Sequence, residues 1–361
     1  MKNICFFNCT KFWGGGEKLH LEYAVKFREK GYNVIITAKN NSPLFQKAKD
    51  AQFQVHSINI GNLSFLNPFK KKKIRSFYKS YNIDTVFFII PSDLKAGGIA
   101  AKKAGVEKIV YLRGIAVPIK RNFLNIYLLK KVVTHIIANS KETKRTILKN
   151  LANDIEPEKI KVIYHGIDIR EHSEKSTNKI FEKEKNEIII GNLGRLTEQK
   201  GHKYLIDLAT ILKNTTQNFK IIIAGEGESK DELVKLAEKS GLKKYVTFLG
   251  FISDVKSFLN EIDIFVLPSI WEGFGFAIVE AMIAEKPVVA FNITSNPEII
   301  IDAETGFLVE FPNVEQFAEK VKLLIDNKEL REALGEKGKL RVIEQFDIDK
   351  KIDELENYLI T

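Results

Sequence analysis

The sequence predicts an α/β protein of two domains, each built around a mostly parallel, doubly wound sheet. Short apolar segments alternate with helical patterns through both halves, and glycine-containing loops follow several of these segments. A charged stretch with few apolar residues, at 169–187, has the composition of an interdomain linker. With 361 residues the chain is long enough for two separate cores.

The first half begins with a βαβ unit. An apolar strand at 2–8 precedes the loop Gly14-Gly15-Gly16, a helical pattern that Gly31 ends, and a second strand at 33–37. The loop is neither a Walker motif nor a GxGxxG motif, so a flexible turn remains the alternative to phosphate binding. Further strands are predicted at 54–60, 85–90, 108–112 and 135–138, with helices at 96–104 and 140–151.

The alternation starts again after the linker. Strands are predicted at 187–193, 219–224, 245–249, 262–267, 287–291 and 306–309, and helices at 201–214, 229–240, 255–260, 314–327 and 329–346. Ligands of open parallel sheets bind at the carboxyl ends of the strands, so functional side chains are expected there.

The stretch 265–281, FVLPSIWEGFGFAIVEA, carries the most informative pattern. Glu272 lies in a glycine loop after a strand, and Glu280 follows eight positions later in a helical segment. Gly273 and Gly275 let the backbone approach a ligand, and the amides at the helix start favour an anion. A sugar nucleotide, with its anionic centre and hydroxyl-rich ends, fits this pattern. The alternative is a turn with solvated glutamates.

Other predicted strand ends carry polar groups or glycines. Arg195 and Lys200 follow the strand at 187–193, Gly225 and Gly227 follow the next strand, and Gly250 follows the one after that. The two cations can neutralise a departing diphosphate without a metal. Singly, each would be interpreted as a solubilising surface charge.

The net charge of +10 is divided unevenly along the chain. Residues 1–168 contain 30 Lys and Arg against 12 Asp and Glu, a net charge of +18, whereas the remainder carries −8. The basic half suggests a polyanionic partner: nucleic acid, an anionic membrane leaflet or a phosphorylated substrate. Because its aromatic residues are not interleaved with Lys and Arg in a recognisable binding module, no nucleic acid partner is expected.

A lysine run provides the membrane hypothesis. Lys70, Lys71, Lys72 and Lys73 follow the apolar and aromatic residues of 65–69, a pattern that suits an anionic membrane surface. A solvated helix start is the commoner alternative. A second basic and apolar segment, at 119–133, favours the membrane interpretation.

Composition also bears on compartment and metals. Cys5 and Cys9 are close together and are expected to be reduced thiols of a cytosolic protein. The apolar run at 4–7 is too short for a signal peptide, and no window reaches the roughly 18 apolar residues of a membrane span. The six histidines have no metal-site spacing. The sequence therefore predicts a cytoplasmic protein, and the lysine run adds the hypothesis of peripheral contact at the inner membrane face.

Four motifs together resemble those of the retaining glycosyltransferases of family four, the group 1 glycosyltransferases with the GT-B fold. They are Gly14-Gly15-Gly16-Glu17, His165-Gly166-Ile167-Asp168, Gly194-Arg195-Leu196 with Lys200-Gly201, and Glu272 with Glu280. The resemblance implies two Rossmann-like domains facing across a cleft. Residues 1–168 would be the acceptor-side domain, 169–345 the nucleotide-sugar-binding domain, and 346–361 a helix returning to the first domain.

The resemblance also implies roles for matching residues. Arg195 and Lys200 would hold the diphosphate, Glu272 the donor sugar and Glu280 the ribose. Catalysis would rest on Glu272, Arg195 and Lys200. The remaining donor-binding positions would be Gly15, Gly16, Gly194, Phe251, Ile252, Gly273, Phe274 and Gly275.

Two departures from the family pattern are present. Where many relatives carry a histidine, this chain has Arg113, which becomes a candidate for binding an acidic acceptor. Asp347 and Asp349 spell DxD, the metal signature of another glycosyltransferase fold, but their place at a helix start suits capping and the helix dipole. No metal or other cofactor is expected.

The resulting hypothesis is transfer of a sugar from a nucleotide-diphosphate sugar to a glycan or glycolipid acceptor. The product would belong to lipopolysaccharide, capsule or a lipid-linked glycan. A catalytically silent sugar-nucleotide-binding protein and a nucleic-acid-binding protein are the alternatives.

Overall fold

The computed structural model describes residues 2–173, 178–216 and 218–360. The chain forms two compact units: unit 1 comprises residues 1–165 and 349–361, and unit 2 comprises residues 166–348. Each unit contains a parallel sheet, and the predicted α/β class with two doubly wound sheets is confirmed.

Among the described residues, unit 1 contains a seven-stranded sheet in the order β3-β2-β1-β4-β5-β6-β7. Its strands are β1 (Asn3–Asn8), β2 (Asn33–Ala38), β3 (Gln54–Ser57), β4 (Thr85–Phe88), β5 (Lys108–Arg113), β6 (His135–Ala138) and β7 (Ile160–Val162). Its helices are α1 (Gly15–Glu29), α2 (Pro43–Asp50), α3 (Pro68–Ser80), α4 (Pro91–Asp93), α5 (Ile99–Ala104), α6 (Phe123–Tyr127), α7 (Lys141–Leu151) and the last helix, α16 (Ile348–Ile360). Strand order reverses between β1 and β4, where ligands of such sheets bind.

The central strands of unit 1 are apolar on both faces because helices cover both. All four residues of β4 are buried, and the rings of Phe6 and Phe87 stack with centroids 4.8 Å apart. Helix α16 is fixed by ion pairs: Lys30 Nζ lies 2.5 Å from Asp353 and 2.6 Å from Glu356. Asp349 lies in the first turn of α16, where its negative charge interacts favourably with the helix dipole, and it also pairs with Lys26.

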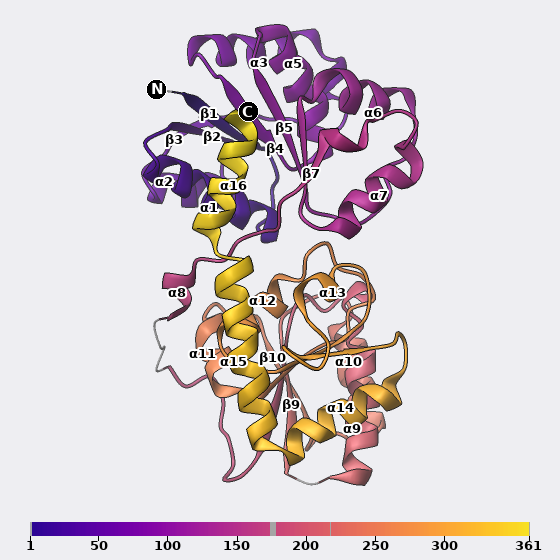
Figure 1. The fold of residues 1–361 in the computed structure, drawn as a ribbon. Helices are drawn as coiled ribbons and strands as arrows, with labels where there is room; N and C mark the ends of the chain where they lie inside the picture. Colours follow the sequence, from indigo (N-terminus) through magenta and orange to yellow (C-terminus); the bar gives the residue numbers. More distant parts are fainter. Residues whose placement is uncertain (1, 174–177, 217, 361) are drawn as a thin grey trace. The chain divides into compact units, whose positions relative to one another are not determined.

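In the described part of unit 2, the sheet has six strands in the order β10-β9-β8-β11-β12-β13. These are β8 (Ile188–Leu193), β9 (Phe219–Ala224), β10 (Val246–Gly250), β11 (Ile264–Leu267), β12 (Val288–Phe291) and β13 (Phe307–Val309). The helices are α8 (Ile169–Ser173), α9 (Lys203–Thr215), α10 (Lys230–Lys239), α11 (Val255–Glu261), α12 (Phe276–Ile283), α13 (Asn296–Ile299), α14 (Val314–Asp326) and α15 (Lys328–Gln345). Helix α14 packs beside α9, and α15 beside α12 (Figure 1). Here the strand order reverses between β8 and β11.

Several elements differ from the sequence prediction. The strand predicted at 54–60 ends at Ser57, and β7 is too short to give a periodic signal. The lysine run lies in α3, which starts at Pro68 after the Asn67 side chain accepts the Lys70 N–H. Within the segment 119–133, Leu128, Leu129 and Val132 are buried in the core of unit 1, so they do not form an apolar surface for a membrane.

The predicted linker at 169–187 lies partly outside the described residues. Its later part, 178–187, is a part of unit 2 and is held there by hydrogen bonds: the Ile180 N–H donates to Glu261 at 2.6 Å, and Lys183 Nζ lies 2.6 Å from Asp263. Throughout the described ranges, no helix combines the length and hydropathy that a membrane span requires.

Candidate active site

The loops that follow β8 and β11 meet at the carboxyl edge of the unit 2 sheet. A Cβ atom at Gly201, whose φ is +63°, would lie only 2.1 Å from the carbonyl oxygen of Pro268. Glycine is therefore required for the first loop to pass the end of β11. This close approach brings Lys200 to Glu272, although the two are 72 positions apart in the sequence.

Lys200 and Glu272 form the central ion pair of the site. Lys200 Nζ lies 2.6 Å from Glu272 Oε1, and the Ser269 hydroxyl donates to the same oxygen at 2.6 Å. The exposed fractions of the two side chains are 19% for Lys200 and 8% for Glu272. Since both are largely removed from water, their attraction is less screened than that of a surface pair.

Backbone hydrogen bonds fix the loop that carries Glu272. The Glu272 N–H donates to Thr294 Oγ1 at 3.0 Å, and the Gln199 side chain donates to the Trp271 carbonyl at 3.0 Å. Thr294 has a φ of +43°, a conformation that a β-branched residue rarely adopts and that costs about 1–3 kcal/mol. The surrounding structure thus maintains local strain at the residue that supports Glu272.

Helix α12 begins immediately after this loop. Gly275, with a φ of +79°, occupies its N-cap position, so the positive end of the helix dipole lies beside the glycines. Glu280 is on α12 and is half-buried. Phe274 is buried, and its ring meets Phe276 and Phe346 edge-on, with centroid distances of 5.4 and 5.5 Å.

Close backbone contacts and backbone hydrogen bonds connect the loop after β8 to the loop after β9, and the loop after β9 to the end of β10. A Cβ at Gly225 would lie 1.9 Å from the carbonyl oxygen of Gly194, and the Leu196 N–H donates to the Glu226 carbonyl at 2.9 Å. The Gly225 N–H in turn donates to the Gly250 carbonyl at 2.8 Å.

Two predicted donor-binding side chains on these loops are accessible to a ligand. Arg195 is exposed and forms no ion pair with any described residue, and Phe251 is 77% exposed, with Ile252 half-buried beside it.

His202 follows Lys200 by two positions and is buried. Burial, together with the charge of Lys200, lowers its pKa to about 4, so the imidazole is neutral at neutral pH. No group of three His, Cys, Asp or Glu residues within the described ranges could hold a metal ion.

Unit 1 places the predicted glycine loop between β1 and α1, which starts at Gly15. A Cβ at Gly16 would lie 3.2 Å from the Ile89 side chain, so the loop passes close to the end of β4. The Asp93 carboxylate accepts the Cys9 N–H at 2.7 Å and so fixes the chain between β1 and the glycine loop. Burial raises the pKa of Asp93 to about 7.

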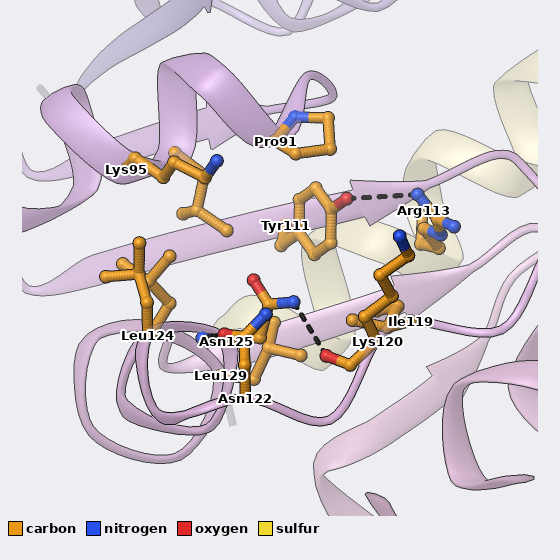
Figure 2. A pocket seen from close by; sticks show the side chains of 12 residues that line it. Pro91, Lys95, Tyr111, Arg113, Ile119, Lys120, Asn122, Leu124, Asn125 and Leu129 are labelled. Carbon is orange, nitrogen blue, oxygen red and sulfur yellow. Dashed lines mark hydrogen bonds between the residues drawn. The ribbon is translucent and has the colours of Figure 1, made fainter. Parts of the chain in front are cut away.

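Arg113 ends β5 and is 8% exposed. Its Nη2 donates to the Val117 carbonyl at 2.9 Å, and its Nη1 lies 3.4 Å from the Tyr111 hydroxyl. It lines a pocket of about 340 Å³ within unit 1 (Figure 2).

The structure brings some of the predicted site residues of unit 2 into contact. Lys200 and Glu272 bond directly, and a Cβ at Gly194 would lie 3.7 Å from Lys200 Cδ. The residues that sequence reasoning missed are Ser269, Thr294, His202 and Asp93. Ser269 could have been found from its place at the end of the strand before Glu272, whereas Thr294 follows a different strand and had no such signal.

The two parallel sheets, each with a reversal of strand order, and the cation–acid pair at one of these reversals define the class: two-unit α/β proteins with a charged site at the carboxyl edge of one sheet. The crystal structure of Anabaena Alr3699/HepE in complex with UDP has the same fold, with a TM-score of 0.85, 22% identity and coverage of 99% of each chain.

Sequence comparisons identify the family. Residues 13–171 match Glycosyltransferase Family 4, and residues 173–341 match the glycosyl transferases group 1. The capsular polysaccharide biosynthesis glycosyltransferase CapM of Staphylococcus aureus is 30% identical over 79% of this chain and 78% of its own. An Escherichia coli UDP-Gal:alpha-D-GlcNAc-diphosphoundecaprenol alpha-1,3-galactosyltransferase is 26% identical over 96% of this chain and 93% of its own. The chain belongs to the group 1 glycosyltransferases of family 4 and is a glycosyltransferase.

Proposed function

We propose that this glycosyltransferase moves a sugar, with retention of configuration, from a nucleotide-diphosphate sugar to a glycan or glycolipid acceptor in cell-envelope polysaccharide biosynthesis. Binding of the nucleotide-sugar donor is supported by one observation, the Lys200–Glu272–Ser269 cluster at the strand-order reversal of unit 2. The class of acceptor is supported by relatives named for capsular polysaccharide and for a diphosphoundecaprenol-linked substrate.

In this proposal the donor lies along the carboxyl edge of the unit 2 sheet. Glu272 holds the sugar hydroxyls and Glu280 the ribose. Arg195 and Lys200 hold the diphosphate, with the backbone of Gly273, Phe274 and Gly275 nearby. Gly194 leaves room beside Lys200, and Phe251 with Ile252 borders the base. Gly15 and Gly16 are the proposed phosphate-binding positions of residues 1–168, the proposed acceptor-side domain, and residues 169–345 are the proposed donor domain.

The proposed chemistry needs no metal. As the sugar–phosphate bond breaks, negative charge develops on the leaving diphosphate, and Arg195 and Lys200 stabilise that charge. The acceptor hydroxyl attacks the sugar from the face that the diphosphate leaves and passes its proton to the departing phosphate oxygen. The ion pair with Glu272 places Lys200 before the donor arrives, so little reorganisation is needed.

The proposal includes a peripheral contact with the inner face of a membrane through the start of α3. Leu63, Leu66 and Phe69 are 71%, 63% and 82% exposed, and they lie directly before the run Lys70, Lys71, Lys72 and Lys73. Exposed apolar groups beside lysines suit an anionic lipid surface. A cytoplasmic location follows from the same proposal.

A donor screen tests this function. We expect turnover with at least one UDP-, GDP- or ADP-sugar in the presence of EDTA. Arg195→Ala and Glu272→Ala are each expected to lower turnover by about 100-fold or more. The matched controls Lys243→Ala and Glu304→Ala change exposed residues of unit 2 and should retain activity. A folded protein that neither binds nor turns over any donor in the panel would refute the proposal.

A further inference from the structure

The pocket of unit 1 is lined by residues from three segments (Figure 2): the one after β4, strand β5, and the segment 119–129. Two of these segments include π-helical turns, Leu94–Gly98 and Leu128–Val132. Such turns are rare and occur often at functional sites. All the lining residues belong to unit 1, at the carboxyl edge of its sheet.

Arg113 gives the pocket its electrostatic character. Arg113 is more than nine-tenths buried as a residue and forms no ion pair with any residue that the structure describes. Its Nε is buried and has no hydrogen-bond partner in the described chain. A buried cation without a counter-charge is costly, and a bound anion removes that cost. The planar guanidinium matches the oxygens of a phosphate or carboxylate.

Two more cations line the same pocket, and their charge is not balanced. Lys95 and Lys120 accompany Arg113, and no aspartate or glutamate is found among the pocket's described lining residues. The carbonyl of Lys120 accepts the Asn125 side chain at 2.8 Å, so the loop that presents this lysine is fixed (Figure 2). Three cations around one small cavity favour a ligand with more than one negative charge.

The rest of the lining is largely apolar. Besides Tyr111, Asn122 and Asn125, it comprises the apolar residues Pro91, Leu94, Ile119, Leu124, Leu128 and Leu129. The volume of about 340 Å³ is at the small end of ligand pockets, which typically measure roughly 300–1,000 Å³. The cavity therefore fits a charged group and the start of a hydrocarbon chain. Phe123, between lining residues Asn122 and Leu124 in sequence, is 86% exposed and offers apolar surface for more of the chain.

We infer that this pocket binds an anionic amphiphile in which a phosphate or diphosphate is joined directly to a hydrocarbon chain. The anion contacts Arg113, Lys95 and Lys120, and the first carbons contact the leucines. This inference rests on the proposed function and narrows its acceptor to a glycan that is linked through a phosphate or diphosphate to a hydrocarbon chain. A soluble acidic glycan is disfavoured, because its hydroxyl groups would be desolvated against the leucines.

Direct binding tests the inference without any nucleotide sugar. Farnesyl diphosphate, below its micelle concentration, is titrated into the full chain, with inorganic pyrophosphate, farnesol and an acidic uronic-acid oligosaccharide titrated separately. We expect farnesyl diphosphate to bind at least about tenfold more tightly than each of the others, because only it satisfies both halves of the pocket.

Variants locate the binding. Arg113→Gln and Lys120→Ala should each weaken binding of farnesyl diphosphate about tenfold. Leu124→Gln should weaken farnesyl diphosphate and leave pyrophosphate unchanged. Lys131→Ala and Leu340→Gln are matched controls, because both residues are exposed and lie outside the lining. Lys120 is itself exposed, so its variant keeps the test valid if Arg113→Gln fails to fold.

Equal affinity for pyrophosphate and farnesyl diphosphate would overturn the inference, as would preference for the acidic oligosaccharide or unchanged binding in Lys120→Ala. Failure of the proposed function is separable. Lipid binding without sugar transfer would overturn that function alone, whereas sugar transfer without lipid binding would overturn the inference alone.

Discussion

Removing Lys200 should destabilise unit 2 through the carboxylate that it leaves behind. The perturbation is Lys200→Met, compared with Glu272→Gln and the double variant. Glu272 Oε1 now has Lys200 Nζ and the Ser269 hydroxyl at 2.6 Å each, and its side chain is only 8% exposed. Without Lys200, the nearly buried Glu272 carboxylate would keep only the neutral Ser269 hydroxyl as a partner.

The expected magnitude follows from that geometry. Loss of one partner of a mostly desolvated, hydrogen-bonded charge costs about 2–3 kcal/mol. Glu272→Gln should cost about 1–2 kcal/mol, because the amide oxygen can still accept from Ser269. In the double variant no charge is stranded, so its loss should be smaller than the sum of the two by about 1–2 kcal/mol. For a unit of this size, the Lys200→Met loss corresponds to a Tm decrease of about 4–12 °C.

The assay uses Trp271, which is next to Glu272 in the sequence. The protein has two tryptophans, so a Trp13→Phe background leaves Trp271 as the single reporter for unit 2. Urea unfolding followed by its fluorescence gives the free energy of each variant. Lys243→Met, at an exposed position, is the matched control and should change stability by less than about 0.5 kcal/mol.

Activity gives an independent measurement on the same variants. Lys200→Met is expected to lower turnover by about 100-fold or more, because the departing diphosphate loses a cation. Single effects on stability that add to within about 0.3–0.5 kcal/mol would refute the coupling between Lys200 and Glu272. Full turnover in a folded Lys200→Met protein would refute the role of the lysine in catalysis.

Two further predictions concern unit 1. Burial raises the pKa of Asp93 to about 7, so the folded state keeps a proton that the unfolded aspartate, with a pKa of about 3.9, has already lost. The stability from Asp93 is therefore present in full below about pH 4 and is lost as the pH rises to about 7. Asp93→Asn should reduce the decrease in the free energy of unfolding between about pH 4 and 7, measured by Trp13 fluorescence in a Trp271→Phe background. An unchanged pH dependence would contradict its assignment to Asp93. Replacing Lys70, Lys71, Lys72 and Lys73 by glutamine should abolish flotation with phosphatidylglycerol vesicles, since each lysine near such a surface contributes about 1 kcal/mol. The matched control neutralises the exposed unit 2 residues Lys235, Lys239, Lys243 and Lys244 and should still float, and equal flotation of both variants would contradict the membrane contact.

The alternation of elements was predictable from local sequence, since apolar periodicity and glycine positions act over a few residues. The strands at 135–138 and 219–224 end where the sequence predicts, and the parallel order follows from alternation with helices. Because parallel strands end at one edge, the strand-end positions of Arg195, Lys200 and Glu272 also indicate a shared site.

Tertiary structure alone decided which side chains bond. The contact of Lys200 with Glu272 depends on how Gly201 passes Pro268, and the support from Thr294 comes from another strand end and a strained φ. Arg113 could be read from the sequence as a cation, but only the packed unit shows it buried without an acidic partner among the described residues, beside leucines from two other segments. Burial and partnership depend on contacts between distant segments, and no local pattern encodes them.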